Sequence, residues 1–149
     1  MTRDELMRQI SKDVEGNCAC NKLRMASRKV TRMYDEAMRP MGITPTQFTL
    51  LAVVGGSDTV TLTELAELLG MERTTLLRNL KPLEREELIA VSAEGYRRAR
   101  SVQLSDKGVS VLSEALPLWR NAQAILKKQL GADIWNQLQI DLTEVDTII

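Results

Sequence analysis

Helix starts and helix stops alternate quickly between residues 44 and 70, and this alternation limits the fold more than any other feature of the sequence. Thr44-Pro45-Thr46-Gln47 combines a capping hydroxyl, a proline for the first helical position and a glutamine three residues after the cap. Thr61 and Glu64 repeat the capping pattern, and glycines at 55–56 and 70 follow the last apolar residues. The sequence therefore predicts helices at 44–54 and 62–69, with room between them for only a very short strand at 60–62.

A further helix and a hairpin complete this segment. From Arg73 to about Glu87 leucines recur at helical spacing, and Pro82 is expected to bend this helix near its middle. Residues 89–93 and 101–104 alternate apolar and polar side chains, which predicts two strands joined by an arginine-rich tip at 94–100. Two short helices joined by a glycine turn and followed by a hairpin predict a winged helix-turn-helix.

Longer helical patterns flank this unit, at 18–39, 105–130 and 133–149. Ser105 is expected to cap the second of these helices. One face of that helix carries Val109, Leu112, Leu116, Trp119, Ala122, Leu126 and Leu130. The predicted fold class is mainly α with a small β-hairpin wing, in which N- and C-terminal dimerisation helices flank the winged helix-turn-helix. The apolar face of the last helix is formed by Ile134, Leu138, Leu142, Val145 and Ile149. Such a face is too apolar for an isolated tail. It packs either against a second copy of the chain or against the core of its own chain.

The composition narrows the classes of function. The 149-residue chain contains no histidine, which removes the commonest general base and the commonest metal ligand. Aromatic residues make up 3%, too few for binding single strands by base stacking. With no phosphate-binding loop and no convergent carboxylate pair in the sequence, we expect neither an enzyme nor a bound metal or cofactor. Because the net charge is zero, a nucleic-acid surface requires local segregation of charge. Lysine and arginine residues concentrate at 22–39 and 73–100, whereas the last helix is acidic.

The second short helix and the hairpin tip supply side chains that suit duplex DNA. Arginine can bond guanine bidentately, asparagine can do the same to adenine, and threonine can contact the methyl group of thymine. Arginines at the tip suit phosphates or a narrow minor groove. The candidate DNA-binding residues are Thr61, Thr63, Arg73, Thr74, Thr75, Arg78, Asn79, Lys81, Arg97, Arg98 and Arg100. The alternative is a solvated helix start and edge charges that keep a hairpin soluble.

Four blocks of sequence carry a family pattern: 39–44 (RPMGIT), 62–71 (LTELAELLGM), 73–85 (RTTLLRNLKPLER) and 98–108 (RARSVQLSDKG). Together they make the chain, from about Cys18 to its end, resemble the MarR family of transcriptional regulators. The resemblance implies an obligate homodimer with interlocking terminal helices and one winged helix per subunit on a palindromic operator. One departure is Tyr96, which stands where the family's wing carries the aspartate of Asp-x-Arg, although Arg98 matches the arginine.

The resemblance also implies how the chain is organised and regulated. Residues 1–149 form a single MarR-type domain with a winged helix-turn-helix core at 44–108, and residues 1–43 and 109–149 supply the dimerisation helices. The implied function is that of a DNA-binding regulator, as a repressor that a small phenolic ligand or an oxidant releases from the operator. The implied ligand pocket lies between the dimerisation helices and the winged unit and involves Met33, Tyr34 and Phe48, which are otherwise plain core.

Cys18 and Cys20 are the only cysteines, and they lie too close together to staple the fold. Two sulfurs without histidine make at most half a zinc site. In MarR-type organic-hydroperoxide regulators a reactive cysteine and a partner tyrosine fall at the positions of Cys20 and Tyr34. The second partner tyrosine of those regulators has no match here, because Arg24 stands near the position where it would be. One interpretation is therefore redox sensing at Cys20, with Cys18 beside it; the other is that Cys20 packs as a small apolar side chain.

The remaining expectations concern location and the competing class of function. No signal-peptide core and no stretch of about 20 apolar residues is visible, and two close thiols suit a reducing compartment, so we expect a cytoplasmic protein with no membrane partner. The competing function is a winged-helix module that assembles with other proteins without binding specific DNA. The two functions differ in salt dependence, because phosphate contacts make binding fall steeply with salt.

Overall fold

The structure, a computed structural model, describes residues 1–92 and 99–149. Its helices are α1 (Arg3–Asp13), α2 (Ala19–Met38), the 3-10 helix η1 (Arg39–Met41), α3 (Pro45–Gly55), α4 (Leu62–Leu68), α5 (Arg73–Arg85), α6 (Asp106–Leu130) and α7 (Ala132–Ile148). Its strands are β1 (Val60–Thr61), β2 (Ile89–Val91) and β3 (Ser101–Leu104). The predicted fold class is confirmed, because helices dominate and the strands form one small antiparallel sheet.

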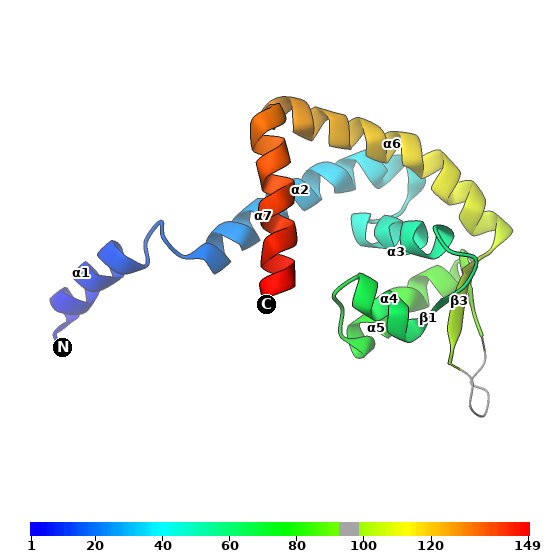
Figure 1. Ribbon diagram of the computed structural model, residues 1–149, viewed down its shortest axis with the longest axis horizontal. Coiled ribbons are helices and arrows are strands. Elements are labelled where there is room, and N and C mark those ends of the chain that lie inside the picture. Colours follow the sequence, from blue (N-terminus) through cyan, green and yellow to red (C-terminus); the bar gives the residue numbers. More distant parts are fainter. Residues whose placement is uncertain (93–98) are drawn as a thin grey trace.

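The elements divide into an arch of helices and a smaller unit beneath it (Figure 1). α2 and α6 run side by side in the arch, and α7 turns back from the far end of α6. α3, α4, α5 and the sheet form the smaller unit, which we call the winged unit. α1 projects beyond the N-terminal end of α2, away from the winged unit (Figure 1). We call α1, α2, α6 and α7 the flanking helices.

Local capping sets the helix starts in the winged unit. Thr44 and Thr61 both form the predicted capping box, in which the threonine hydroxyl accepts the N–H of Gln47 or Glu64. The Gln47 or Glu64 side chain in turn accepts the N–H of the threonine. The largest fully buried side chains are Met38, Leu50, Leu51, Val54, Leu62, Leu65, Leu76, Leu83 and Val102. The caps fix where α3 and α4 begin, and Leu50, Leu51, Leu62 and Leu65 of these two helices face the core.

The sheet contains one strand more than the predicted hairpin. β2 and β3 pair as expected, with Ala90 opposite Gln103. β1 adds to the other edge of β3, with Val60 opposite Val102, and the strand order is β1-β3-β2. Val60 and Val102 are both buried, so this pairing ties the base of the hairpin to the start of α4.

The packing of α6 differs from the prediction at its start. The sequence placed Val109 on the apolar face of this helix, and in the structure its side chain is 51% exposed. The buried positions are instead Gly108, Ala115 and Ala122. A Cβ atom on Gly108 would lie 2.0 Å from the carbonyl oxygen of Leu88, so a glycine is needed for this approach. The start of α6 meets the winged unit through small residues, and periodicity in large apolar residues does not reveal such an approach.

The flanking helices bury little within the described parts of the chain. α1 and α7 contain no buried residue, and α2 buries only Met38. The exposed apolar side chains of these three helices include Leu6, Met7, Ile10, Leu23, Met25, Val30, Ile134, Ile140, Leu142, Val145 and Ile148. The apolar face of α7 therefore does not close the core of its own chain. Among the described residues, no helix is both long and apolar enough to cross a membrane.

Candidate nucleic-acid interface

α5 is amphipathic in a way that leaves one polar stripe open. Leu76, Leu80 and Leu83 are buried beneath it. Because a helix turns once in roughly 3.6 residues, Thr74, Arg78 and Lys81 lie on the opposite side, and all three are exposed. Arg73, the first residue of the helix, is exposed as well. The structure thus brings three of the predicted DNA-binding residues together on one face of α5, whereas Arg73 lies at the start of the helix, beside α4.

Two other predicted residues of α5 lie at the edge of this stripe. Thr75 and Asn79 are half-buried, and the Asn79 Nδ2 atom donates a hydrogen bond of 2.9 Å to the carbonyl oxygen of Thr75. Part of the Asn79 amide is therefore engaged by its own helix. This contact stabilises the orientation of Asn79 and leaves its Oδ1 atom for another donor.

The start of α4 supplies one free hydroxyl and one engaged hydroxyl. Thr61 Oγ1 donates to Glu64 Oε2 at 2.9 Å and accepts the Glu64 N–H at 3.1 Å. Hydrogen bonds from the Thr61 backbone and side chain lower the pKa of the Glu64 carboxyl below its usual value. Thr63 is exposed, with no side-chain hydrogen bond among the described residues. Thr61 thus acts as a helix cap, whereas the Thr63 hydroxyl is exposed and does not take part in the cap.

The arginines predicted for the wing divide into two groups. Arg97 and Arg98, together with Tyr96, lie outside the described residues. Arg100 is half-buried at the base of the hairpin, where its Nε atom donates to the carbonyl oxygen of Ser92 at 3.3 Å. Arg100 therefore braces the two strands where the sheet begins.

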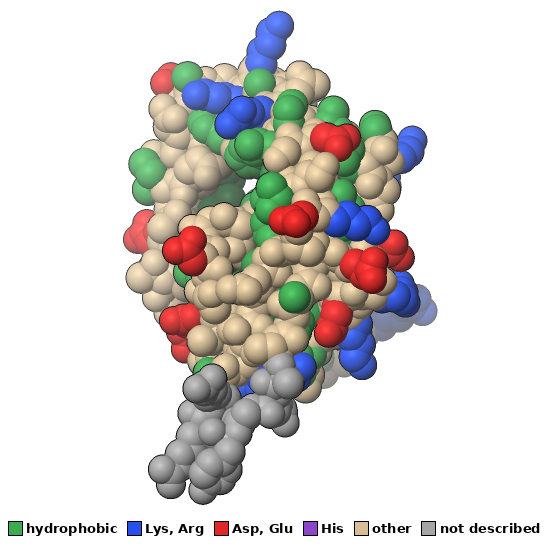
Figure 2. All heavy atoms as spheres, turned by 90° about the vertical axis from the view of Figure 1, so that its right-hand side faces the viewer, with side chains coloured by type: hydrophobic (Ala, Val, Ile, Leu, Met, Phe, Trp, Pro, Cys, Tyr) green, Lys and Arg blue, Asp and Glu red, His purple; other side chains and the backbone are tan. Residues whose placement is uncertain are grey.

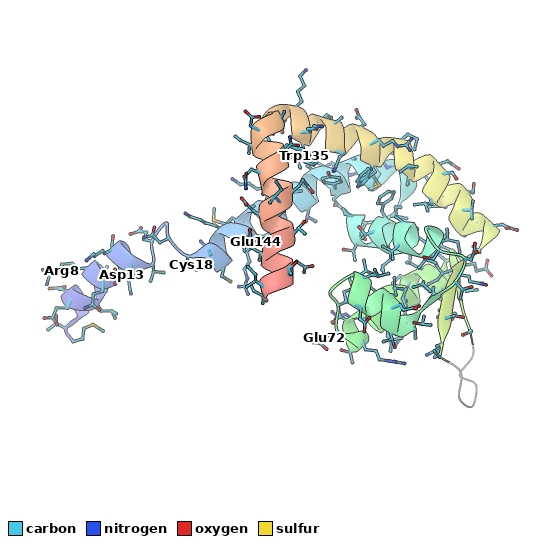
Figure 3. The ribbon with its side chains drawn as sticks, in the orientation of Figure 1. Arg8, Asp13, Cys18, Glu72, Trp135 and Glu144 are labelled. Carbon is cyan, nitrogen blue, oxygen red and sulfur yellow. The ribbon has the colours of Figure 1, made fainter. Side chains whose placement is uncertain are left out.

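A hollow of about 390 Å³ separates α4 from the start of α5. Thr63, Glu67, Glu72 and Arg73 are among its lining residues. Figure 3 shows Glu72 at the turn that precedes α5, at the lower edge of the winged unit. Glu72 was not among the residues predicted from the sequence, although it directly precedes the predicted Arg73.

The surface around the start of α6 and the hairpin has a different character from the α5 stripe. On the side of the molecule drawn in Figure 2, acidic and basic side chains are interspersed with apolar ones. Such a mixed surface gives a polyanion little net attraction. The α5 stripe contains Arg78 and Lys81 without an acidic residue between them.

A second cavity lies where α2, α3 and α6 meet. It measures about 180 Å³ and is lined by Val30, Thr31, Tyr34, Met38, Pro45, Phe48, Thr49 and Trp119. Phe48 and Trp119 stack with ring centroids 5.9 Å apart, and the Tyr34 hydroxyl donates to Oε1 of Gln123. Burial raises the pKa of the Tyr34 hydroxyl. Met33 is half-buried and is not among the lining residues, whereas Trp119 and Gln123 were missed because they come from a distant helix.

Both cysteines are free thiols at the junction of α1 and α2. Cys18 is the N-cap residue of α2 and is half-buried, and Cys20 is exposed (Figure 3). Tyr34 lies on the same helix fourteen residues later, about 21 Å along the axis at a rise of roughly 1.5 Å per residue. The Tyr34 of the same chain therefore cannot reach the Cys20 sulfur. Within the described residues, no group of three cysteine or acidic side chains is arranged to hold a metal ion.

Comparisons of the sequence and of the structure with known proteins identify the family of this chain. A family model described as the MarR family matches residues 41–99. The M. tuberculosis transcriptional regulator MosR, in a crystal structure with DNA, is 39% identical with a TM-score of 0.81, over 89% of this chain and 96% of MosR. The transcriptional repressor CouR, bound to a 23-mer DNA duplex, is 25% identical with a TM-score of 0.78, over 94% of this chain and 96% of CouR. A search of the curated proteins finds no significant match.

A more distant structure agrees in fold. A mutant of E. coli MarR complexed with operator DNA is 22% identical, with a TM-score of 0.79 over 91% of this chain and 96% of that protein. The winged unit and its flanking helices define a winged-helix protein of the class that regulates transcription. The chain belongs to the MarR family of DNA-binding transcription regulators. This membership agrees with the expectation that the chain is not an enzyme.

Proposed function

We propose that the protein is a transcriptional repressor that binds a palindromic operator as a homodimer, with α5 of each copy in a major groove. The observation that carries the proposal is the exposed stripe of Thr74, Arg78 and Lys81 opposite the buried leucines of α5. A helix of this kind presents its N-terminal residues to base edges in a helix-turn-helix. MosR, with 39% identity, was crystallised with DNA, which supports the same partner here.

The conformation of the chain is also consistent with DNA binding. MosR aligns with a TM-score of 0.81 in its structure with DNA and 0.75 in another crystal structure. The arrangement of the winged unit and flanking helices is therefore nearer to that of the DNA complex.

The exposed apolar side chains of the flanking helices are proposed to pack against a second copy of the chain. α1 and α7 bury no residue in their own chain, although apolar side chains such as Ile10, Leu142 and Val145 lie along them. Self-association through a two-fold interface removes such faces from water. The division into a winged core at 44–108 and dimerisation segments at 1–43 and 109–149 is part of this proposal. Light scattering after size exclusion should give twice the mass of the chain.

Anisotropy titrations with operator and random duplexes test DNA binding. We expect the affinity for duplex to fall about 10³-fold or more over a fourfold rise in salt, if six or more phosphates are contacted. Arg78→Ala should cost about 1–3 kcal/mol and relax the preference at one base pair. Arg120→Ala, an exposed arginine of α6, serves as the matched control. Salt-insensitive binding, or none, would favour the competing function in protein–protein assembly.

The proposed inducer is a small phenolic compound that occupies the cavity of Tyr34, Phe48 and Trp119. Stacked aromatic rings and a hydroxyl–amide pair offer both apolar contact and hydrogen bonds. Titration with salicylate should change tryptophan fluorescence and release the operator. Tyr34→Phe should weaken both effects in parallel, whereas an unchanged response in this variant would locate the ligand elsewhere.

Oxidation of Cys20 is the second proposed signal, since its thiol is free and exposed. A phenolic partner for this thiol would have to be the Tyr34 of the second copy, because the Tyr34 of the same chain is too distant. Treatment with cumene hydroperoxide should weaken operator binding in the wild-type chain and leave Cys20→Ser unaffected. Equal operator affinity before and after oxidation would refute this signal.

A further inference from the structure

The turn before α5 carries an acidic residue at the end of the helix that is proposed to enter DNA. Glu72 is the N-cap residue of α5, with φ −62° and ψ 143°, and it is exposed. Its side chain makes no capping hydrogen bond, unlike Thr44, Thr61 and Ser105 at the starts of other helices. Within the described residues the Glu72 carboxylate has no hydrogen-bond or ion-pair partner, although Arg73 follows it directly. Both charged groups are therefore available to a ligand.

We propose that Glu72 and Arg73 read one C·G base pair, with Glu72 accepting from the N4 amino group of cytosine and Arg73 donating to guanine. This inference rests on the proposed function. Glu72 and Arg73 both border the hollow between α4 and α5, together with Thr63 from the start of α4. When Thr63 reaches a phosphate, the first residues of α5 lie over the neighbouring base edges.

The chemistry of the major groove restricts what a carboxylate can read. Phosphates repel it, so Glu72 weakens contact with any duplex unless a base donates to it. Cytosine presents a lone N4 donor, whereas the N6 donor of adenine lies beside the N7 acceptor, which repels a carboxylate. Arginine in turn matches the O6 and N7 acceptors of guanine. Adjacent side chains of opposite charge thus complement the two bases of a single C·G pair.

The test begins with the wild-type chain and selection of bound sites from random duplexes. A C·G pair should appear at one position of each half-site. Affinities are then measured for Glu72→Ala, Glu72→Gln and Arg73→Ala, on duplexes that carry each of the four base pairs at that position. One further duplex replaces the cytosine by 2-pyrimidinone, which lacks the N4 amino group. Glu67→Gln is the matched control, because it removes the same charge from the same hollow.

The expected results separate base reading from bulk charge. Wild-type chain should prefer C·G by about tenfold and lose most of that preference on 2-pyrimidinone. Glu72→Ala should bind random duplex more tightly, lose the preference, and be indifferent to the 2-pyrimidinone substitution. Glu72→Gln should shift the preference toward A·T, since glutamine pairs with adenine N6 and N7. Arg73→Ala should lose discrimination at the same base pair, and Glu67→Gln should keep the wild-type preference.

Three outcomes would overturn the inference. The first is that the selected sites lack a C·G pair at any position that responds to Glu72→Ala or Glu72→Gln. Both Glu72 variants and Glu67→Gln could change the affinity for all duplexes by one common factor, which would make Glu72 a charge only. A wild-type chain that selects no site would instead refute the proposed function itself, so the two failures are distinguishable. Circular dichroism of each variant verifies that this exposed position leaves the fold intact.

Discussion

The winged unit and the flanking helices use apolar side chains in opposite ways. In the winged unit Leu51, Leu65 and Leu76 are fully buried by elements of the same chain. In α7 the side chains of Leu142 and Val145 remain exposed, and α1 buries nothing. One region therefore completes its own core, and the other requires a second surface. The residues that stabilise the fold and the residues proposed to mediate assembly therefore lie in separate parts of the chain.

A charge on α7 should have the largest effect. Leu142→Glu puts a carboxylate on the face proposed to meet the second copy, where burial of an unpaired charge is costly. We expect a monomer in light scattering and operator affinity lower by about 10²–10⁴-fold, because two linked half-site contacts become one. Asn136→Glu introduces the same charge on the opposite side of α7 and should remain dimeric. If the Leu142→Glu variant is dimeric and binds the operator with normal affinity, the apolar face of α7 does not form the contact with the second copy.

A cavity in the winged unit should have the next largest effect, on folding rather than on assembly. Leu76→Ala removes a fully buried side chain beneath α5 and should lower the free energy of unfolding by about 2–5 kcal/mol. Urea denaturation measures the loss. Leu23→Ala, at an exposed position of α2, should leave the unfolding of the winged unit almost unchanged. Equal losses in the two variants would contradict the division into two regions.

The joint between the regions can be tested at Gly108. An alanine there would bring Cβ to 2.0 Å from the Leu88 carbonyl oxygen, which also accepts the Ser105 N–H. We expect the variant to lose about 1–3 kcal/mol of stability, because backbone atoms must move apart. Gly56→Ala is the control, since its nearest non-neighbour atom is 3.4 Å away. Thermal melts of both variants should differ clearly.

The cap of α4 should give the smallest effect. Thr61→Ala removes a capping hydroxyl and should cost about 1 kcal/mol. The lowered pKa of Glu64 adds a pH dependence whose sign follows from linkage: this stabilisation is present above the usual glutamate value of 4.5 and is lost as pH falls through the lower folded value. The gap in stability between wild type and Thr61→Ala should therefore narrow below about pH 4. A gap independent of acid pH would exclude Glu64 from the cap.

Features within one turn of helix were predictable from the sequence. The caps at Thr44, Thr61 and Ser105, the boundaries of α4 and α5 and the strands of the hairpin all appear where expected. A cap depends on four consecutive residues, and a buried stripe depends on spacing along one helix. The exposed face of Thr74, Arg78 and Lys81 follows from the same spacing.

Features that join distant segments were not predictable. The pairing of β1 with β3, the cavity shared with Trp119 and the exposed position of Val109 each depend on how separate elements approach one another. The hydrogen bond of Asn79 to Thr75 depends on a side-chain rotation that the sequence leaves open. Periodicity reports which face of a helix is apolar, and it does not report which element covers that face.

The starts of α3, α4, α5 and α6, the apolar face of each of these helices and the exposed charged residues of α5 all followed from local sequence. Only the tertiary structure decided which apolar faces the chain covers by itself, that small residues set the approach of α6, and that Glu72 shares a hollow with Thr63 and Arg73. The two groups of features differ in how far apart in the sequence the interacting residues lie. Capping and periodicity act over a few residues along the backbone, whereas burial is a property of surfaces that meet only after the chain has folded.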